Sequence, residues 1–114
     1  AAIIHNGYVN DPVAMKAESV VKMATIHGAN VQQRSDTGSL EVGKRADIVA
    51  IDLDKPHLMP NLNPLALLVY SAQASDVVMT MVDGKILYEG GEYLTVDKER
   101  IMREFALSLR YLYP

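Results

Sequence analysis

The sequence contains no cysteine and no tryptophan, and phenylalanine occurs once among its 114 residues. The lack of cysteine excludes disulfide bonds and thiolate metal sites, and it favours a reducing compartment, so we expect a cytoplasmic protein. The formal net charge of -3 argues against a nucleic-acid partner, because such surfaces are normally basic. No apolar run approaches the length of a membrane span, so no membrane partner is expected.

Hydrophobic residues make up 49% of the chain, which predicts one modest globular domain with a core of its own. The first residues, Ala1-Ala-Ile-Ile, are too short for the core of a signal peptide and lack a basic flank. Residues 1–7 favour the tail of a helix that ends at Gly7. With no initiating methionine, this pattern predicts a piece of a longer protein.

The stretch 38–54 begins as a turn-rich loop and becomes a strand. Alternation places Ile48, Ala50 and Asp52 on one face and Val49, Ile51 and Leu53 on the other. Both faces are mostly apolar, which is typical of a strand covered on both sides. We therefore predict a central strand at about 46–53 in a small sheet.

A hairpin is predicted at about 76–89, because Asp83-Gly84 suits the positive φ angles of a type I′ turn. Glu92-Tyr-Leu indicates a brief further strand. Flanking helices are predicted at about 12–27, 64–71 and 97–112, capped by Asp11, Asn63 and Asp97. The fold class is therefore α+β.

The last helix carries apolar residues at helical spacing, and we expect them to form a buried stripe: Ile101, Phe105, Leu109 and Leu112. Strands that are apolar on both faces need more cover than these helices provide. The remaining cover must come from sequence outside this chain or from a second copy. We therefore expect the isolated chain to self-associate.

The segment from Gly38 to Lys44 matches most of a phosphate-binding loop. The next position should be Ser or Thr to hold magnesium, but Arg45 stands there. The segment also precedes a strand and not a helix, so no helix N-terminus faces a phosphate. A turn that uses its glycines for tight backbone angles is the favoured interpretation.

No other residue set forms a complete catalytic or metal-binding pattern. His5, His27 and His57 lack metal-ligand spacing, and we expect a helix-capping role for His27. Asp47, Asp52 and Asp54 flank the central strand. They could serve acid–base chemistry, or they could be solvated or cap turns. Ser71 and Ser75 have no nearby base in the sequence, so a nucleophilic role is not supported.

Five tyrosines are expected at an interface or at the edge of the core: Tyr70, Tyr88, Tyr93, Tyr111 and Tyr113.

Four segments in order resemble the C-terminal part of metal-dependent amidohydrolases. They are Ala24-Thr-Ile-His-Gly-Ala29, Gly38-Ser-Leu-Glu-Val-Gly-Lys-Arg-Ala-Asp47, Lys55-Pro-His-Leu-Met-Pro60 with Asn63-Pro-Leu-Ala-Leu-Leu-Val-Tyr-Ser-Ala72, and Asp76-Val-Val-Met-Thr-Met-Val-Asp-Gly-Lys85. The third is similar to the branch of 5′-methylthioadenosine/S-adenosylhomocysteine deaminases and chlorohydrolases. Segments 1–34 and 35–114 would then be the last barrel-flanking helices and part of a small β-sandwich with a terminal helix, forming a single compact unit that is incomplete without upstream sequence.

The resemblance implies a (β/α)₈ barrel that is absent from this chain and that holds zinc or iron. The metal activates a water that expels ammonia or chloride from an aromatic ring. The implied ligands are an H-x-H pair, two later histidines and an aspartate that should precede Ala1. None matches a position here, and His57 matches a family position without a ligand role. We therefore assign no catalytic, cofactor-binding or metal-binding residue to this chain.

On this interpretation the chain itself is inactive, and its partners are the missing N-terminal part and further copies of the protein. One alternative is a stand-alone binding or assembly module derived from the sandwich. Another is a different amidohydrolase branch, such as a cyclic-amide hydrolase or a deacetylase.

Overall fold

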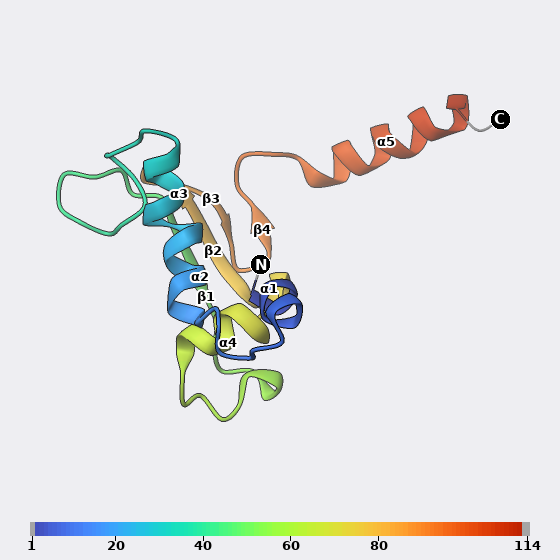
Figure 1. Ribbon diagram of the computed structural model, residues 1–114. Coiled ribbons are helices and arrows are strands. Elements are labelled where there is room, and N and C mark those ends of the chain that lie inside the picture. The colour runs from blue at the N-terminus through green and yellow to red at the C-terminus, as the bar shows by residue number, and fades with distance from the viewer. Residues whose placement is uncertain (1, 113–114) are drawn as a thin grey trace.

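The structure is a computed structural model that describes residues 2–112, and its elements are shown in Figure 1. The helices are α1 (Ala2–Val9), α2 (Ala17–Ala24), α3 (Ile26–Val31), α4 (Pro64–Tyr70) and α5 (Lys98–Leu112), with 3₁₀ turns η1 (Pro56–Leu58) and η2 (Ala74–Asp76). The strands are β1 (Ile48–Ile51), β2 (Val77–Val82), β3 (Lys85–Glu89) and β4 (Glu92–Tyr93). They form one antiparallel sheet in the order β1-β2-β3-β4. The predicted α+β class is confirmed.

The hairpin predicted at 76–89 is formed by β2 and β3. Asp83 and Gly84 have φ angles of 52° and 78°, so both take the positive values that the predicted turn needs. Val82 is paired with Lys85 across this turn. The β2–β3 pairing shifts register between Thr80 and Met81, as a β-bulge does.

The predicted central strand is shorter than expected and lies at one end of the strand order. Within residues 2–112, β1 is paired only with β2, and the side chain of Val49 is exposed. The prediction of a central strand was therefore wrong for this chain. Apolar residues on both faces show how much cover a strand needs, but they do not specify which strands pair with it.

The helix predicted at 12–27 begins later, at Ala17. The Asn6 side chain accepts a hydrogen bond from the Met15 amide (2.8 Å) and donates one to the Pro12 carbonyl (3.0 Å). These bonds hold residues 12–15 in a turn. Asp11 accepts from the Val13 amide (2.9 Å), so it caps that turn and not a helix. The preceding helix also runs two residues beyond the end predicted at Gly7.

The same predicted helix is broken at Thr25, whose φ and ψ are -119° and -101°. A separate short helix, α3, follows, and it contains His27 and Gly28. The prediction that His27 caps a helix end was therefore wrong. The other two helices agree closely with their predictions, because Asn63 caps the Ala66 amide (3.1 Å) and Asp97 caps the Arg100 amide (2.8 Å).

The body of the molecule is the sheet together with α1 to α4, and α2 packs on α4 (Figure 1). Among residues 2–112 few apolar residues are buried, namely Ala2, Ala29 and Leu58, and of these Leu58 is fully buried. Leu58 lies in η1 and is 0% exposed, so it anchors the proline-rich loop to the body. Within residues 2–112, no helix combines the length and apolar character that crossing a bilayer requires.

The last helix, α5, stands away from the body (Figure 1). The predicted buried stripe on it is exposed instead, including Ile101, Phe105 and Leu109. The radius of gyration is 18.2 Å, whereas a compact domain of this size has about 13 Å. The described residues are therefore more extended than a compact domain of the same length. An amphipathic pattern shows that a helix has an apolar face, but the partner of that face can lie outside the chain.

Candidate functional site

The most enclosed polar group of the described chain is the carboxylate of Asp76, at the end of η2. Its Oδ2 atom accepts hydrogen bonds from the Gln73 amide (2.8 Å) and from Nε2 of His57 (2.9 Å). Its own carbonyl accepts from the Asp52 amide (2.8 Å). Asp76 therefore joins three segments, namely η1, η2 and the end of β1.

The Gln73 amide and, next, the His57 hydrogen bond lower the pKa of the Asp76 carboxyl. A general acid or base works best when its pKa lies near the operating pH. The lowered pKa keeps this group ionised at neutral pH as a hydrogen-bond acceptor. The arrangement is that of a structural link between a loop and a sheet.

The carboxylates that flank β1 make the bonds of turn-capping groups. Asp47 accepts from the Asp83 amide (2.8 Å), which ties the start of β1 to the hairpin turn. Asp52 accepts from the Asp54 amide (2.9 Å) and pairs with Lys55 (2.8 Å). The Lys55 hydrogen bond and then the Asp54 amide lower the pKa of Asp52. The contacts of Asp47 and Asp52 favour turn capping, and Asp54 is exposed to solvent.

The segment that resembles a phosphate-binding loop leads into β1 and not into a helix. Lys44, which would have to contact a phosphate, is paired with Glu41 (3.0 Å) and hydrogen-bonded to Ser39. Gly38 has a φ of 86°, and a Cβ atom there would lie 2.8 Å from Cβ of Ala29. The glycine thus allows the loop to pass close under α3, as the interpretation of a tight turn predicts.

The remaining single-residue candidates are scattered. His5 and His27 are exposed on α1 and α3, far in sequence from His57. Ser71 is the C-terminal cap residue of α4, and Ser75 is exposed in η2. Across residues 2–112, no group of three or more His, Asp or Glu side chains is arranged to hold a metal ion.

The tyrosines divide between the sheet and the helices. The rings of Tyr88 and Tyr93 lie 5.2 Å apart, and Lys98 lies over Tyr93 (5.7 Å to the ring centre). Tyr70 donates to the Met15 carbonyl (3.4 Å). Tyr111 is exposed on α5, and Tyr113 lies outside the described residues. These contacts are the packing of partly exposed side chains.

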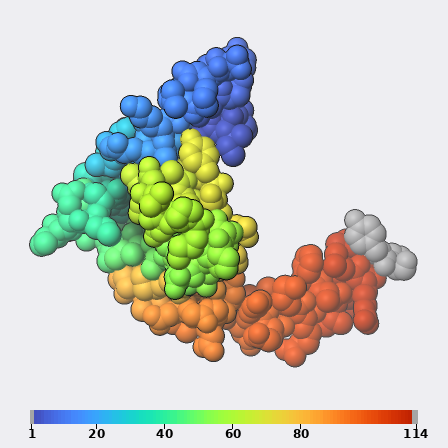
Figure 2. Space-filling view, turned by 90° about the horizontal axis from the view of Figure 1, so that it is seen from below, coloured from blue at the N-terminus to red at the C-terminus, as the bar shows by residue number. Residues whose placement is uncertain are grey.

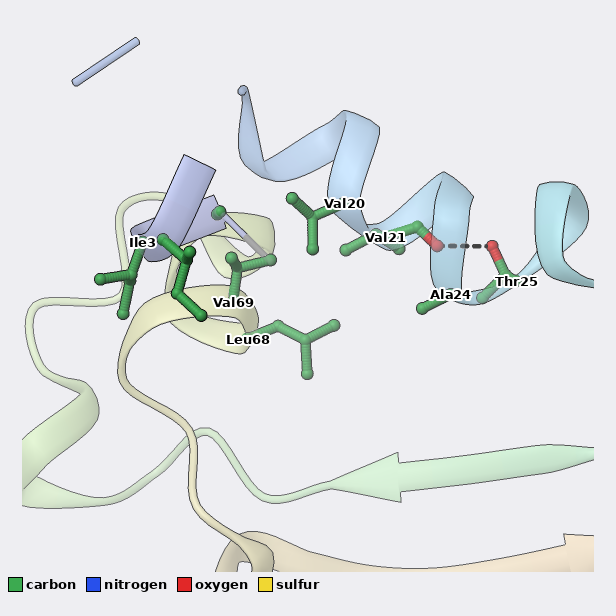
Figure 3. A pocket seen from close by; sticks show the side chains of 9 residues that line it. Ile3, Val20, Val21, Ala24, Thr25, Leu68 and Val69 are labelled. Atoms are coloured by element: carbon green, nitrogen blue, oxygen red, sulfur yellow. Dashed lines mark hydrogen bonds between the residues drawn. The ribbon is translucent and has the colours of Figure 1, made fainter. Parts of the chain in front are cut away.

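A groove of about 600 Å³ lies where α1, α2 and α4 meet (Figure 3). Its walls are mostly aliphatic and include Ile3, Val20, Val21, Ala24, Leu68 and Val69. The Thr25 hydroxyl in the wall donates to the Val21 carbonyl (2.7 Å), so it is already bonded. The groove is a packing surface without groups for chemistry. Its walls come from segments far apart in the chain, so no local sequence pattern indicates it.

Two solved structures resemble this chain closely. An adenosine deaminase from Xanthomonas campestris with bound zinc has a TM-score of 0.87 and 30% identity, over 96% of this chain and 26% of that one. The atrazine chlorohydrolase from Arthrobacter aurescens, complexed with zinc, has a TM-score of 0.74 and 28% identity, over 81% and 20%. The fold is therefore that of a segment of larger hydrolytic enzymes.

The sequence model of the amidohydrolase family matches residues 1–87, and the chain belongs to this family. A curated relative, the 5-methylthioadenosine/S-adenosylhomocysteine deaminase of Thermoanaerobacter pseudethanolicus, is 48% identical over 103 residues. The match covers 90% of this chain and 24% of the relative, so the chain spans about a quarter of that enzyme's length. The predicted resemblance to amidohydrolases, and to their deaminase and chlorohydrolase members, is confirmed.

Proposed function

We propose that this chain is the C-terminal structural portion of a hydrolase that removes ammonia from the adenine ring of 5′-methylthioadenosine or S-adenosylhomocysteine. The observation that carries this proposal is the 48% identity to a deaminase of that name along 90% of the chain. The proposed portion comprises residues 1–34, which flank the barrel, and residues 35–114, which form part of the sandwich and the terminal helix.

The metal that this family implies does not fit the side chains of residues 2–112. No cluster of ligands is present there, and His57 already bonds to Asp76. We therefore propose that the metal, zinc or iron, and every catalytic residue belong to the rest of the protein. Zinc in both solved neighbours supports zinc as the metal.

In this proposal the chain acts by positioning other parts of the enzyme. The aliphatic groove between α1, α2 and α4 packs against the barrel, because large exposed apolar surfaces mark interaction sites. The bond between His57 and Asp76 holds the proline-rich loop against the sheet. The upstream part of the same protein is the expected partner, together with further copies in a homo-oligomer, and the cysteine-free composition supports a cytoplasmic location.

The test is a hybrid enzyme in which residues 1–114 replace the matching quarter of the Thermoanaerobacter deaminase. We expect the hybrid to bind zinc and to release ammonia from 5′-methylthioadenosine. The isolated 114-residue chain should do neither, since it lacks a ligand cluster among the described residues. Stoichiometric zinc and turnover in the isolated chain would refute the proposal, as would a folded hybrid without activity.

The likeness to the chlorohydrolase supports a second candidate, in which the parent enzyme expels chloride from a triazine ring. Assaying the hybrid cannot decide this point, because its barrel comes from a deaminase. The upstream reading frame of this chain, expressed with it as one protein, should be tested on both substrates. Chloride release without ammonia release would favour the second candidate. A reading frame that stops just before Ala1 would instead favour a stand-alone binding module.

A further inference from the structure

The exposed face of α5 is a continuous apolar arc, formed by Ile101, Met102, Phe105, Leu109 and Leu112. At 3.6 residues per turn, these side chains cover roughly 100° of the helix circumference. Ile101 is 50% exposed and Phe105 57%. An arc of this width on a surface helix normally faces a core.

The opposite side of α5 carries charges. Arg100 and Glu104 form an ion pair there (3.0 Å), and Arg103 and Arg110 follow the same side of the helix. Leu107 also lies on this side and is 51% exposed. The helix therefore suits one apolar contact on one face and water on the other.

A second α5 helix is a poor partner for this arc. With a rise of 1.5 Å per residue, the 15 residues of α5 extend over about 22 Å. Coiled coils are recognised over about three or four heptads, which is longer than this helix. The arc is also broader than the narrow seam of a coiled coil. A broad apolar body fits it better than a single helix.

The shape of the molecule indicates where that body lies. In Figure 2 the chain forms a crescent, with the N-terminal helices at one end, α5 at the other and a hollow between them. The match to the Xanthomonas deaminase covers 96% of the chain, so a counterpart of most of α5 is included in that match.

We propose that α5 is an arm that docks, by its apolar arc, on the part of the same polypeptide that lies outside these 114 residues. That part would sit in the hollow of the crescent, held by α5 at one end and the N-terminal helices at the other. The inference rests on the proposed function, in which the complete protein is about four times as long as this chain. A second copy of the protein is the competing occupant.

Photo-crosslinking in the hybrid enzyme separates these occupants. A photoreactive phenylalanine analogue replaces Phe105 on the arc, and the same analogue at Leu107, on the charged side, is the matched control. We expect a crosslink at position 105 to residues of the same polypeptide, outside the 114-residue segment, and little at position 107. Crosslinks from position 105 to a second polypeptide, or equal yields at both positions, would overturn the proposal.

A matched pair of substitutions gives a second readout. Ile101→Asp should raise amide hydrogen exchange in α5 by about tenfold, because it places a charge in an apolar contact. Leu107→Asp should change exchange by less than about twofold. The mass of the native assembly in solution, measured by light scattering, should stay the same in both variants. Equal effects of the two variants, or a fall in mass with Ile101→Asp alone, would contradict docking within one polypeptide.

Activity of the unmodified hybrid is measured separately. If the hybrid folds and crosslinks from position 105 as expected but does not deaminate, the proposed function fails while the docking of α5 stands. If it deaminates but crosslinks between subunits, the proposed function stands and the docking inference fails.

Discussion

The body of this chain and the arm α5 use apolar side chains in opposite ways. In the body, Leu58 is completely buried although it lies in a single 3₁₀ turn within the proline-rich loop. The helix α5 is regular, amphipathic and capped by Asp97, yet its apolar side chains, such as Phe105, remain exposed. Regular secondary structure and burial are therefore separate properties. Local sequence sets the first, and the second depends on which surfaces are available to cover the side chain.

Leu58→Ala is expected to have one of the two largest effects on stability, beside Gly38→Ala. The substitution leaves a cavity at a fully buried position, and we expect it to lower the free energy of unfolding of the body by about 2 to 5 kcal/mol. Urea denaturation of the hybrid, monitored by hydrogen exchange in β2, measures this loss of free energy. Leu62→Ala changes an exposed leucine four residues on, and it should cost less than about 0.5 kcal/mol. Equal losses would contradict the special role of Leu58.

Gly38→Ala tests the close contact between the loop and α3. Gly38 and Gly43 both have positive φ, 86° and 89°, but of the two only Gly38 has a neighbour that an added Cβ atom would clash with. Gly43→Ala should therefore cost about 1 to 2 kcal/mol from backbone strain alone. Gly38→Ala should cost about 1 to 3 kcal/mol more, because Ala29 has to move. Thermal unfolding of the two variants side by side gives the difference, and equal midpoints would show that the contact is unimportant.

Asp76→Asn should change how the stability of the body depends on pH. The native pKa of Asp76 is lowered, so its ionised form stabilises the fold above the unfolded-state pKa of about 3.9. This contribution is lost as the pH falls through the lower native value. We expect the unsubstituted protein to lose stability in this acidic range. The Asp76→Asn variant should be less stable at neutral pH, and its stability should fall less as the pH is lowered. Urea midpoints at several pH values report both effects, and parallel pH profiles would refute the assignment.

The smallest effect is expected in the arm. Asp97→Ala removes the cap of the Arg100 amide and should destabilise α5 by about 1 kcal/mol, with no change in the sheet. Asp97→Asn keeps an oxygen acceptor at the same place and should be nearly neutral. Hydrogen exchange resolved by segment separates the helix from β2 and β3. Loss of protection in the sheet would mean that the arm and body are not independent.

Local signals predicted those parts of the fold whose partners are close in sequence. The hairpin followed from Asp83-Gly84, whose backbone angles have the required sign. The caps at Asn63 and Asp97 followed from residue type, because such a side chain bonds an amide three residues on.

The missed features depend on contacts across the chain. Asn6 prevents a helix at residues 12–15 through a side chain that lies nine residues before Met15. The pairing between His57 and Asp76 joins residues 19 positions apart. Nor could the position of β1 at the end of the strand order be deduced from its composition. Sequence motifs identified the family, but the aliphatic groove required the assembled helices.

The connection between β1 and β2 has a consequence for the order of folding. The hairpin β2–β3 is closed by two residues, whereas β1 joins β2 only after the whole of segment 52–76 has been looped back. Closing a long loop costs more chain entropy than closing a tight turn. We therefore expect the hairpin to form first and to act as the template on which β1 is added. On a ribosome, β1 would leave the exit tunnel early and wait unpaired until Glu89 had left it as well.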